Sequence, residues 1–159
     1  VVTANYCRIK NIPYLGICLG MQIAAISFAR YACGLKDANS REFDENSSNK
    51  IIDFLPDQND GVDKGGTLRL GAYPCAVKKG TKMYECYGSE LISERHRHRY
   101  EFNNDYRKVL TDAGLTISGT SPDDYIVETI EVSDNDFYVG VQFHPEFKSR
   151  PNRPHALFL

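Results

Sequence analysis

Residues 12–22, IPYLGICLGMQ, set a cysteine between two glycines at the junction of a predicted strand and a predicted helix. The apolar run 12–15 ends at Gly16, and apolar residues recur at helical spacing over 21–32. Gly-x-Cys-x-Gly at such a junction is the thiol version of a nucleophile elbow, a tight turn in which a Cβ on either side would clash. We therefore expect Cys18 at a helix N-terminus, where the partial positive charge favours its thiolate. The alternative is a structural cysteine buried beside a packing glycine.

The composition indicates one globular domain, or most of one, with 42% hydrophobic side chains among 159 residues. The chain has 19 basic and 21 acidic side chains and a net charge of -2, which gives no reason to expect a nucleic-acid partner. Neither a membrane-spanning apolar stretch nor a signal-peptide pattern occurs, so we expect no membrane partner. The five cysteines are odd in number and form no CxxC pair. This pattern argues against a zinc ribbon or a disulfide framework and favours a reduced, cytoplasmic compartment.

The remaining pattern is typical of an α/β domain. Residues 1–10 read as the end of a helix that leads into the first strand, so we expect the N-terminal part of the domain to be missing. Further elements are predicted as strands at 67–77, 92–102, 115–120, 126–132 and 137–143, a helix at 103–113, and loops at 36–50 and 56–66. This mixture predicts a mainly parallel central sheet flanked by helices, with added antiparallel strands.

A thiol nucleophile needs a base, and the best-placed histidine is His144. It follows the predicted strand 137–143, and Glu146 stands two residues later with Pro145 between them. Because proline biases the preceding residue toward extended backbone, the two side chains should point the same way. The carboxylate could then fix the imidazole tautomer and stabilise the imidazolium, as the third member of a triad does. The alternative is an ordinary turn after a strand.

Residues 92–102 alternate basic and histidine side chains, so a strand here would separate them onto two faces. One face would carry Arg95, Arg97, Arg99 and Glu101, and the other His96, His98 and Tyr100. The arginines could form a solvated face, a phosphate grip or a clamp on a carboxylate. No neighbouring cysteine or histidine completes a tetrahedral metal site with the two histidines, so we expect no metal.

Several of these segments resemble known families. GICLGMQ at 16–22, together with HPE at 144–146, resembles the class I glutamine amidotransferases, in which a Cys-His-Glu triad hydrolyses glutamine to glutamate and ammonia. Four further segments resemble, more narrowly, the glutaminase domain of CTP synthases. They are EFD (42–44), GGTLRLG (65–71), ERHRHRYEFN (94–103) and VQFHPEFKSRP (141–151). The resemblance extends over residues 12–151 and implies the flavodoxin-like fold of class I amidotransferases.

The resemblance implies roles for the catalytic residues. Cys18 corresponds to the nucleophile, His144 to the base and Glu146 to the carboxylate that orients it. Leu19 corresponds to the residue whose backbone N–H forms half of the oxyanion hole. The other half comes, in that family, from a glycine-rich loop that would precede Val1.

The resemblance also implies residues that bind the substrate. Gln22, Glu42 and Arg99 correspond to residues that hold glutamine, and Arg99 does so through the α-carboxylate. Arg97 is the expected neighbour in support of Arg99, and Arg95 is left without a role.

The whole chain, residues 1–159, is accordingly interpreted as a glutaminase domain without its synthetase domain. The resemblance implies L-glutamine as substrate and no cofactor in this domain. Ammonia would pass to a synthetase domain of the same polypeptide, which uses ATP and Mg²⁺ to convert UTP into CTP. GTP would be an allosteric activator, with the segment 56–66 a candidate for that communication, and the full-length protein would be a homotetramer.

Three alternatives are left open by the residues. The chain could be the glutaminase domain of another class I amidotransferase that serves a different synthetase. It could be a catalytically silent regulatory module of the same fold, although Cys18, His144 and Glu146 argue against this. It could also be a thiol hydrolase of γ-glutamyl peptides, which would need a more open pocket.

Overall fold

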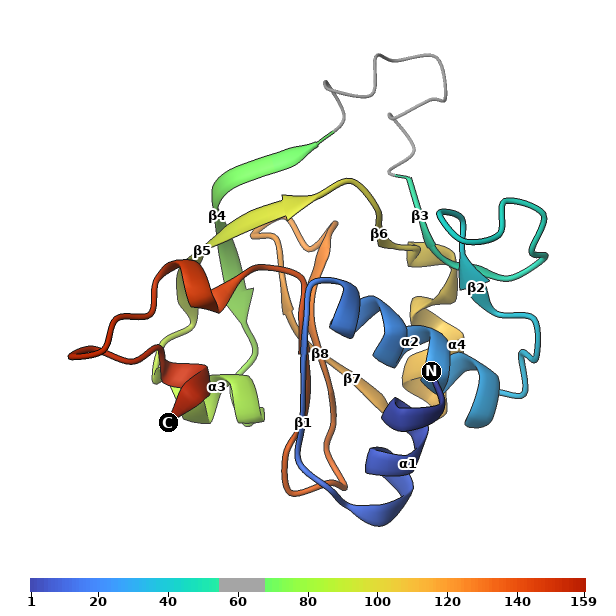
Figure 1. Cartoon of the computed structure of the whole chain (residues 1–159), viewed down its shortest axis with the longest axis horizontal. Coiled ribbons are helices and arrows are strands. Elements are labelled where there is room, and N and C mark those ends of the chain that lie inside the picture. The colour runs from blue at the N-terminus through green and yellow to red at the C-terminus, as the bar shows by residue number, and fades with distance from the viewer. Residues whose placement is uncertain (55–67) are drawn as a thin grey trace.

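The computed structural model describes residues 1–54 and 68–159, so the loop predicted at 56–66 lies outside the described residues. Its helices are α1 (Val2–Lys10), α2 (Leu19–Tyr31), α3 (Lys82–Tyr87) and α4 (Arg107–Asp112), with short 3₁₀ turns η1 (Asn104–Tyr106), η2 (Pro145–Phe147) and η3 (Ala156–Phe158) (Figure 1). Its strands are β1 (Tyr14–Ile17), β2 (Asn39–Ser40), β3 (Lys50–Asp53), β4 (Arg69–Val77), β5 (Leu91–His98), β6 (Glu101–Phe102), β7 (Leu115–Thr120), β8 (Val127–Val132) and β9 (Tyr138–Val141). None of the helices in the described ranges is long and apolar enough to cross a membrane.

The central sheet has six strands in the order β1-β9-β8-β7-β4-β5. Among the described residues, β1 and β9 are its one parallel pair, and the other neighbours are antiparallel. The prediction of a mainly parallel sheet is therefore wrong for this part of the chain, although the α/β class is right. Because β7, β8 and β9 follow one another through the short connections 121–126 and 133–137, the chain can only reverse direction between them.

Helices cover both faces of this sheet (Figure 1). Alternate residues of β9 enter different apolar clusters, because successive side chains on a strand point to opposite faces. Tyr138 packs into the cluster that contains α2, α4 and the small sheet, whereas Val139 and Val141 pack into the cluster that contains α3 and η3. β9 is buried throughout and therefore forms the middle layer of the molecule.

Helix α2 lies very close to the sheet because it crosses a glycine of β9. A Cβ on Gly140 would lie 3.1 Å from the Cα of Met21 and 3.0 Å from Ile130. Alanines at 24, 25 and 29 keep the buried side of α2 narrow, and all three are fully buried. The start of α2 is therefore fixed against the edge of the sheet where β1 and β9 end.

The predicted strand 92–102 is divided between two sheets. Its alternation is confirmed as far as His98: Glu94, His96 and His98 are buried, and Arg95 is exposed. The chain then turns, and β6 pairs with β3 in a smaller sheet of order β2-β3-β6. The placement of Glu101 on the arginine face is therefore wrong, because after this turn its side chain is only 2% exposed.

Two predicted segments acquire more structure than expected. The loop predicted at 36–50 contains β2 and the first residue of β3, which form the parallel pair of the smaller sheet. The helix predicted at 103–113 begins as the turn η1, where the Asn103 side chain accepts a hydrogen bond from the Asp105 N–H, and continues as α4. These segments place Glu42 and the β6 region beside the N-terminal half of α2.

Candidate active site

Cys18 occupies a strained turn between β1 and α2. Its φ is +51° and its ψ is -103°, a conformation that L-residues rarely adopt. Its backbone N–H donates to the carbonyl of Val141 at 2.7 Å, which ties the turn to the end of β9. Strain of this kind costs about 1–3 kcal/mol and persists where the surroundings enforce it, as they do at functional sites. The predicted elbow is present.

The two glycines of the elbow are not equivalent. A Cβ on Gly16 would lie 2.6 Å from the carbonyl carbon of Gly20 and 2.8 Å from the Tyr14 ring, so glycine is required there. At Gly20 the nearest atom to an added Cβ would be the Tyr14 hydroxyl, at 3.9 Å. The expectation that both glycines avoid a clash therefore holds for Gly16 only.

His144 and Glu146 contact each other as the spacing predicts. The Nδ1 of His144 lies 2.6 Å from the Oε1 of Glu146, and the Phe147 ring stacks on the imidazole at 4.9 Å between centroids. Because a carboxylate only accepts, Nδ1 carries the proton and Nε2 is left as a lone-pair acceptor. Nε2 is buried and has no hydrogen-bond partner among the described residues. The imidazole is thus oriented to take up a proton.

The parallel pairing of β1 and β9 brings the cysteine and the histidine to one edge of the sheet. Ile17 is paired with Val141, so the residues that follow both strands emerge together at their carboxyl ends. The backbone N–H of His144 also donates to the carbonyl of Arg95 at 2.8 Å, which fixes the histidine segment to β5. Ligands of open α/β sheets bind at the carboxyl ends of the strands.

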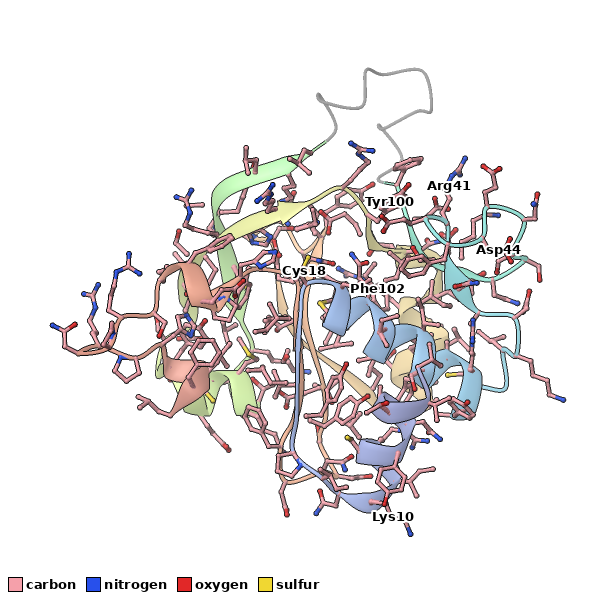
Figure 2. The ribbon with its side chains drawn as sticks, in the orientation of Figure 1. Lys10, Cys18, Arg41, Asp44, Tyr100 and Phe102 are labelled. Atoms are coloured by element: carbon pink, nitrogen blue, oxygen red, sulfur yellow. The ribbon has the colours of Figure 1, made fainter. Side chains whose placement is uncertain are left out.

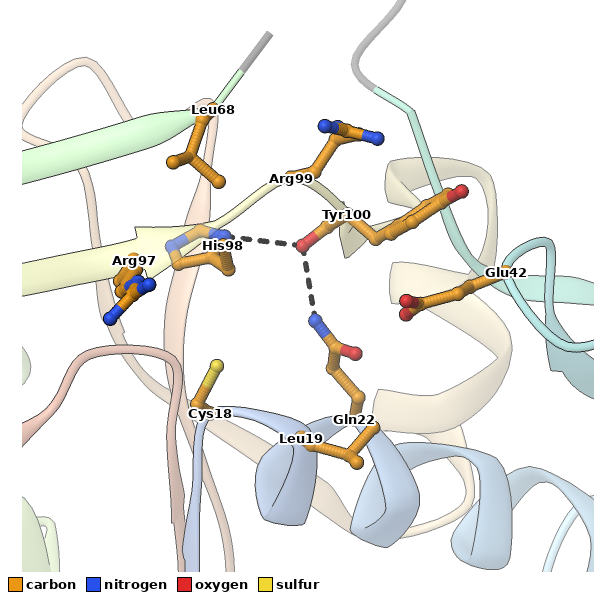
Figure 3. A pocket seen from close by; sticks show the side chains of 9 residues that line it. All are labelled: Cys18, Leu19, Gln22, Glu42, Leu68, Arg97, His98, Arg99 and Tyr100. Carbon is orange, nitrogen blue, oxygen red and sulfur yellow. Dashed lines mark hydrogen bonds between the residues drawn. The ribbon is translucent and has the colours of Figure 1, made fainter. Parts of the chain in front are cut away.

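A cavity of about 380 Å³ opens above the elbow, a size suited to a small metabolite (Figure 3). It is lined by Cys18, Leu19, Gln22, Glu42, Leu68, Arg97, His98, Arg99 and Tyr100. The lining contains the predicted nucleophile, the predicted oxyanion residue and all three predicted glutamine contacts, together with Arg97. His144 and Glu146 are not part of the lining; they lie at the end of the neighbouring strand.

Figure 3 shows the sulfur of Cys18 directed into this cavity. Burial raises the pKa of the Cys18 thiol, and the carboxylates of Glu101 and Glu146 raise it further. Hydrogen bonds from the Leu19 N–H and the Gln142 side chain lower the pKa. Two hydrogen-bond donors therefore favour the thiolate of Cys18, whereas burial and the two carboxylates favour the neutral thiol.

Sequence reasoning missed Gln142. Its side-chain Nε2 lies 3.6 Å from the sulfur of Cys18, within hydrogen-bonding range for sulfur. It is fully buried, in the apolar run YVGVQF at 138–143. A single polar residue in a buried run was the available signal, because a buried amide must find partners.

Of the other residues singled out in the sequence, Arg95 and His96 lie outside this cavity, whereas His98 belongs to its lining. Arg95 lines a second cavity, of about 500 Å³, formed mainly by η2 and the segment that follows it. His96 and His98 contact each other, with 2.8 Å between Nδ1 of His96 and Nε2 of His98. Within residues 1–54 and 68–159 no three side chains of metal-ligand type are clustered.

Comparison with known proteins places the chain in a family. A family model described as "Glutamine amidotransferase class-I" matches residues 1–159. The chain belongs to the class I glutamine amidotransferases. Similar relatives of this amidotransferase include the CTP synthases of Moorella thermoacetica, 59% identical over 158 residues, and of Caldanaerobacter subterraneus, 61% identical over 154 residues. These matches cover 99% and 97% of this chain but 29% of each relative, so the chain spans less than a third of their length.

A solved structure is similar over nearly the whole amidotransferase chain. It is described as the glutaminase domain of Trypanosoma brucei CTPS with bound acivicin. It is 39% identical, with a TM-score of 0.91, over 98% of this chain and 61% of that chain. The similarity confirms the class I amidotransferase fold, including its mixed sheet flanked by helices.

Proposed function

We propose that this chain is the glutaminase domain of a CTP synthase and hydrolyses L-glutamine to glutamate and ammonia. The observation that carries the proposal is the elbow itself. A strained cysteine at a helix start opens into a cavity that contains both an arginine and a carboxylate, and the next parallel strand ends in an oriented histidine. The sequence similarity to CTP synthases supports the choice of this subfamily.

The cavity offers complementary groups to the two ends of an amino acid. Arg99 presents a guanidinium that suits the α-carboxylate of glutamine, and Arg97 adds a second positive charge to the same lining. Glu42, which also lines this cavity, suits the α-ammonium group (Figure 3). With those ends held, the side-chain amide of glutamine would extend toward Cys18.

The chemistry then proceeds as acyl transfer. Nε2 of His144 takes the proton of the Cys18 thiol, and the resulting thiolate attacks the amide carbon while the Leu19 N–H donates to the oxygen as it becomes negative. Nε2 of His144 delivers a proton to the nitrogen as the C–N bond breaks, which releases ammonia and leaves a thioester. Water, deprotonated by Nε2, then attacks the thioester, and glutamate leaves as the thiolate is restored. Glu146 holds the imidazole and stabilises its protonated form.

The wider protein belongs to the same proposal. The ammonia would serve a synthetase domain of the same polypeptide, in which ATP and Mg²⁺ drive the amination of UTP to CTP. GTP would activate glutamine hydrolysis, and the full-length enzyme would be a cytoplasmic homotetramer. The synthetase part is supported by relatives of which this chain covers 29%.

Covalent labelling tests the site directly. A glutamine-like electrophile such as acivicin, the ligand named for the trypanosomal domain, should modify Cys18, and excess L-glutamine should protect it. Peptide mapping identifies the labelled residue. Cys75 is a matched internal control, because it is fully buried and burial raises its thiol pKa far above the usual range. Labelling at Cys75 or Cys86 with Cys18 unmodified would contradict the proposal.

A further inference from the structure

A chain of amide contacts leads from the sulfur of Cys18 to the backbone of the β5–β6 turn. Gln142 Nε2 lies 3.6 Å from the sulfur. The Oε1 of Gln142 accepts from Nε2 of Gln22 at 3.1 Å, and the same Nε2 donates to the carbonyl of Tyr100 at 3.1 Å. Figure 3 shows the second of these contacts. Both glutamines are buried, at 0% and 3% exposure, although one comes from the end of β9 and the other from α2.

The Tyr100 carbonyl fixes the orientation of both amides. A backbone carbonyl only accepts, so the group of Gln22 that faces it must be the NH₂. The second hydrogen of that NH₂ then points at Gln142, which must present its oxygen to it. A flipped Gln142 would place two NH₂ groups against each other. Gln142 is therefore left with its N–H groups directed toward the sulfur.

A donor at this position favours the thiolate. Burial opposes ionisation of Cys18, and Glu101 and Glu146 add to the opposition. The other donor near the sulfur is the Leu19 N–H, which in the proposed reaction also serves the developing oxyanion. The side chain of Gln142 has no such second role, so it can stay with the sulfur throughout, including when the thiolate leaves the thioester.

We propose that Gln142 donates the hydrogen bond that stabilises the thiolate of Cys18. Gln22 is a positioning residue, because its N–H donates to the Oε1 of Gln142 and so holds the Gln142 amide in this orientation. The role of Gln142 during turnover rests on the proposed glutaminase function. Its effect on the ionisation of the Cys18 thiol does not depend on that function. A consequence for Gln22 is that its two N–H groups are already used. It can offer glutamine only its carbonyl oxygen, which suits the α-ammonium group rather than the α-carboxylate.

The pH dependence of Cys18 alkylation tests this arrangement without any substrate. The rate of modification by iodoacetamide, followed at Cys18 by peptide mapping, rises with the thiolate fraction. Gln142→Met removes the donor at similar volume and should move the midpoint of the profile up by about one pH unit or more, as expected for a hydrogen bond to a charged group. Gln142→Asn retains an amide that is too short to reach and should shift the midpoint in the same direction. Gln22→Met should give a smaller upward shift, because Gln142 is then free to rotate.

Ser118→Ala is the matched control. It also removes a buried polar group, which bonds to Thr129 at 2.8 Å on the neighbouring strands, and it should leave the midpoint unchanged. Circular dichroism establishes that each variant is folded. A profile for folded Gln142→Met and Gln142→Asn that superimposes on that of the unmodified chain would overturn the inference. If the midpoint moves but the unmodified chain hydrolyses no glutamine, the inference stands and the proposed function fails.

Discussion

Gly16 and Gly20 look alike in the sequence, yet the structure gives them different tasks. Gly16 lies against the backbone of Gly20, where nothing can yield to a side chain. Gly20 lies inside α2, where a side chain has room and where glycine is a poor helix former. The strain at Cys18 therefore depends on one glycine, and the second is free to vary as far as packing is concerned.

Substitution at the two glycines should have opposite effects on stability. Gly16→Ala should lower the free energy of unfolding by about 1–3 kcal/mol, the usual cost of overpacking. Gly20→Ala should leave it unchanged or raise it by up to about 1 kcal/mol, because alanine is the better helix former. Urea unfolding of both variants measures the difference. Equal losses at the two positions would show that the close approach at Gly16 does not decide the turn.

A charge deletion at Arg99 should separate substrate binding from thiol reactivity. Arg99→Ala should raise the KM for glutamine by about 10- to 100-fold, because a hydrogen bond to a charged group contributes about 1.5–3 kcal/mol. Alkylation of Cys18 by iodoacetamide should continue at its normal rate. Arg95→Ala is the control, since Arg95 lines the second cavity and not the one above Cys18. An unchanged KM in Arg99→Ala would remove this residue from the carboxylate site.

At the scale of one element, β5 joins the site to the core. Its exposed face carries Arg95 and Arg97, and its buried face carries His96 and His98, which lie beside carboxylates of β8 and β6. Glu128 of β8 lies 2.5 Å from Arg69 and 3.5 Å from Nε2 of His96. The strand is therefore held by a buried polar network, one end of which reaches the Tyr100 carbonyl through His98 at 3.2 Å.

This network should make stability depend on pH. Burial lowers the pKa of His96 to about 2 and of His98 to about 3, and the charge of Arg69 acts in the same direction. Below the ordinary histidine pKa of about 6.5 the unfolded chain takes up protons that the folded chain does not, so stability falls as pH falls. Each such histidine should cost about 1 kcal/mol between pH 6 and pH 5.

His96→Gln isolates one of these contributions. The difference in free energy of unfolding between the parent and this variant should shrink by about 1 kcal/mol between pH 6 and pH 5. Burial also raises the pKa of Glu101 and Glu128, but both are present in the two proteins. Denaturant titrations at pH 7, 6 and 5 provide the measurement. A difference that is constant over this range would mean that His96 takes up its proton in the folded chain as readily as in the unfolded one.

At the scale of the whole molecule, local patterns predicted the elements well and long-range pairing poorly. The elbow at Cys18, the contact between His144 and Glu146, and the alternation along β5 all depend on neighbours in sequence, and all are present. Whether neighbouring strands run parallel or antiparallel, and where β5 ends after His98, depend on partner strands that are distant in the sequence. The Gln142–Cys18 contact joins residues 124 positions apart, so no local pattern could assign it.

The proposed coupling to a synthetase can be tested in the longer polypeptide. Cys18→Ala should abolish glutamine-dependent formation of CTP from UTP and ATP, because no thiolate remains to release ammonia. Formation of CTP from added ammonium salt should persist at the parental rate, since ammonia bypasses the glutaminase. Product analysis with each nitrogen source provides the measurement. Loss of both activities in a folded variant would place Cys18 outside a separable glutaminase step.

The insertion of β9 between β1 and β8 has a consequence for folding. Among the described strands of the central sheet, β9, which lies beside β1 and supports Cys18, is the last to be synthesised, although Cys18 itself is near the start of the described chain. Contacts of such large sequence separation form late, because their loop-closure entropy must be overcome first. While the chain is still emerging from the ribosome, the cysteine has neither its oriented imidazole nor its amide donor. The hydrogen bond from Gln142 to the sulfur of Cys18 can therefore form only after residues 138–142 have been synthesised and paired beside β1.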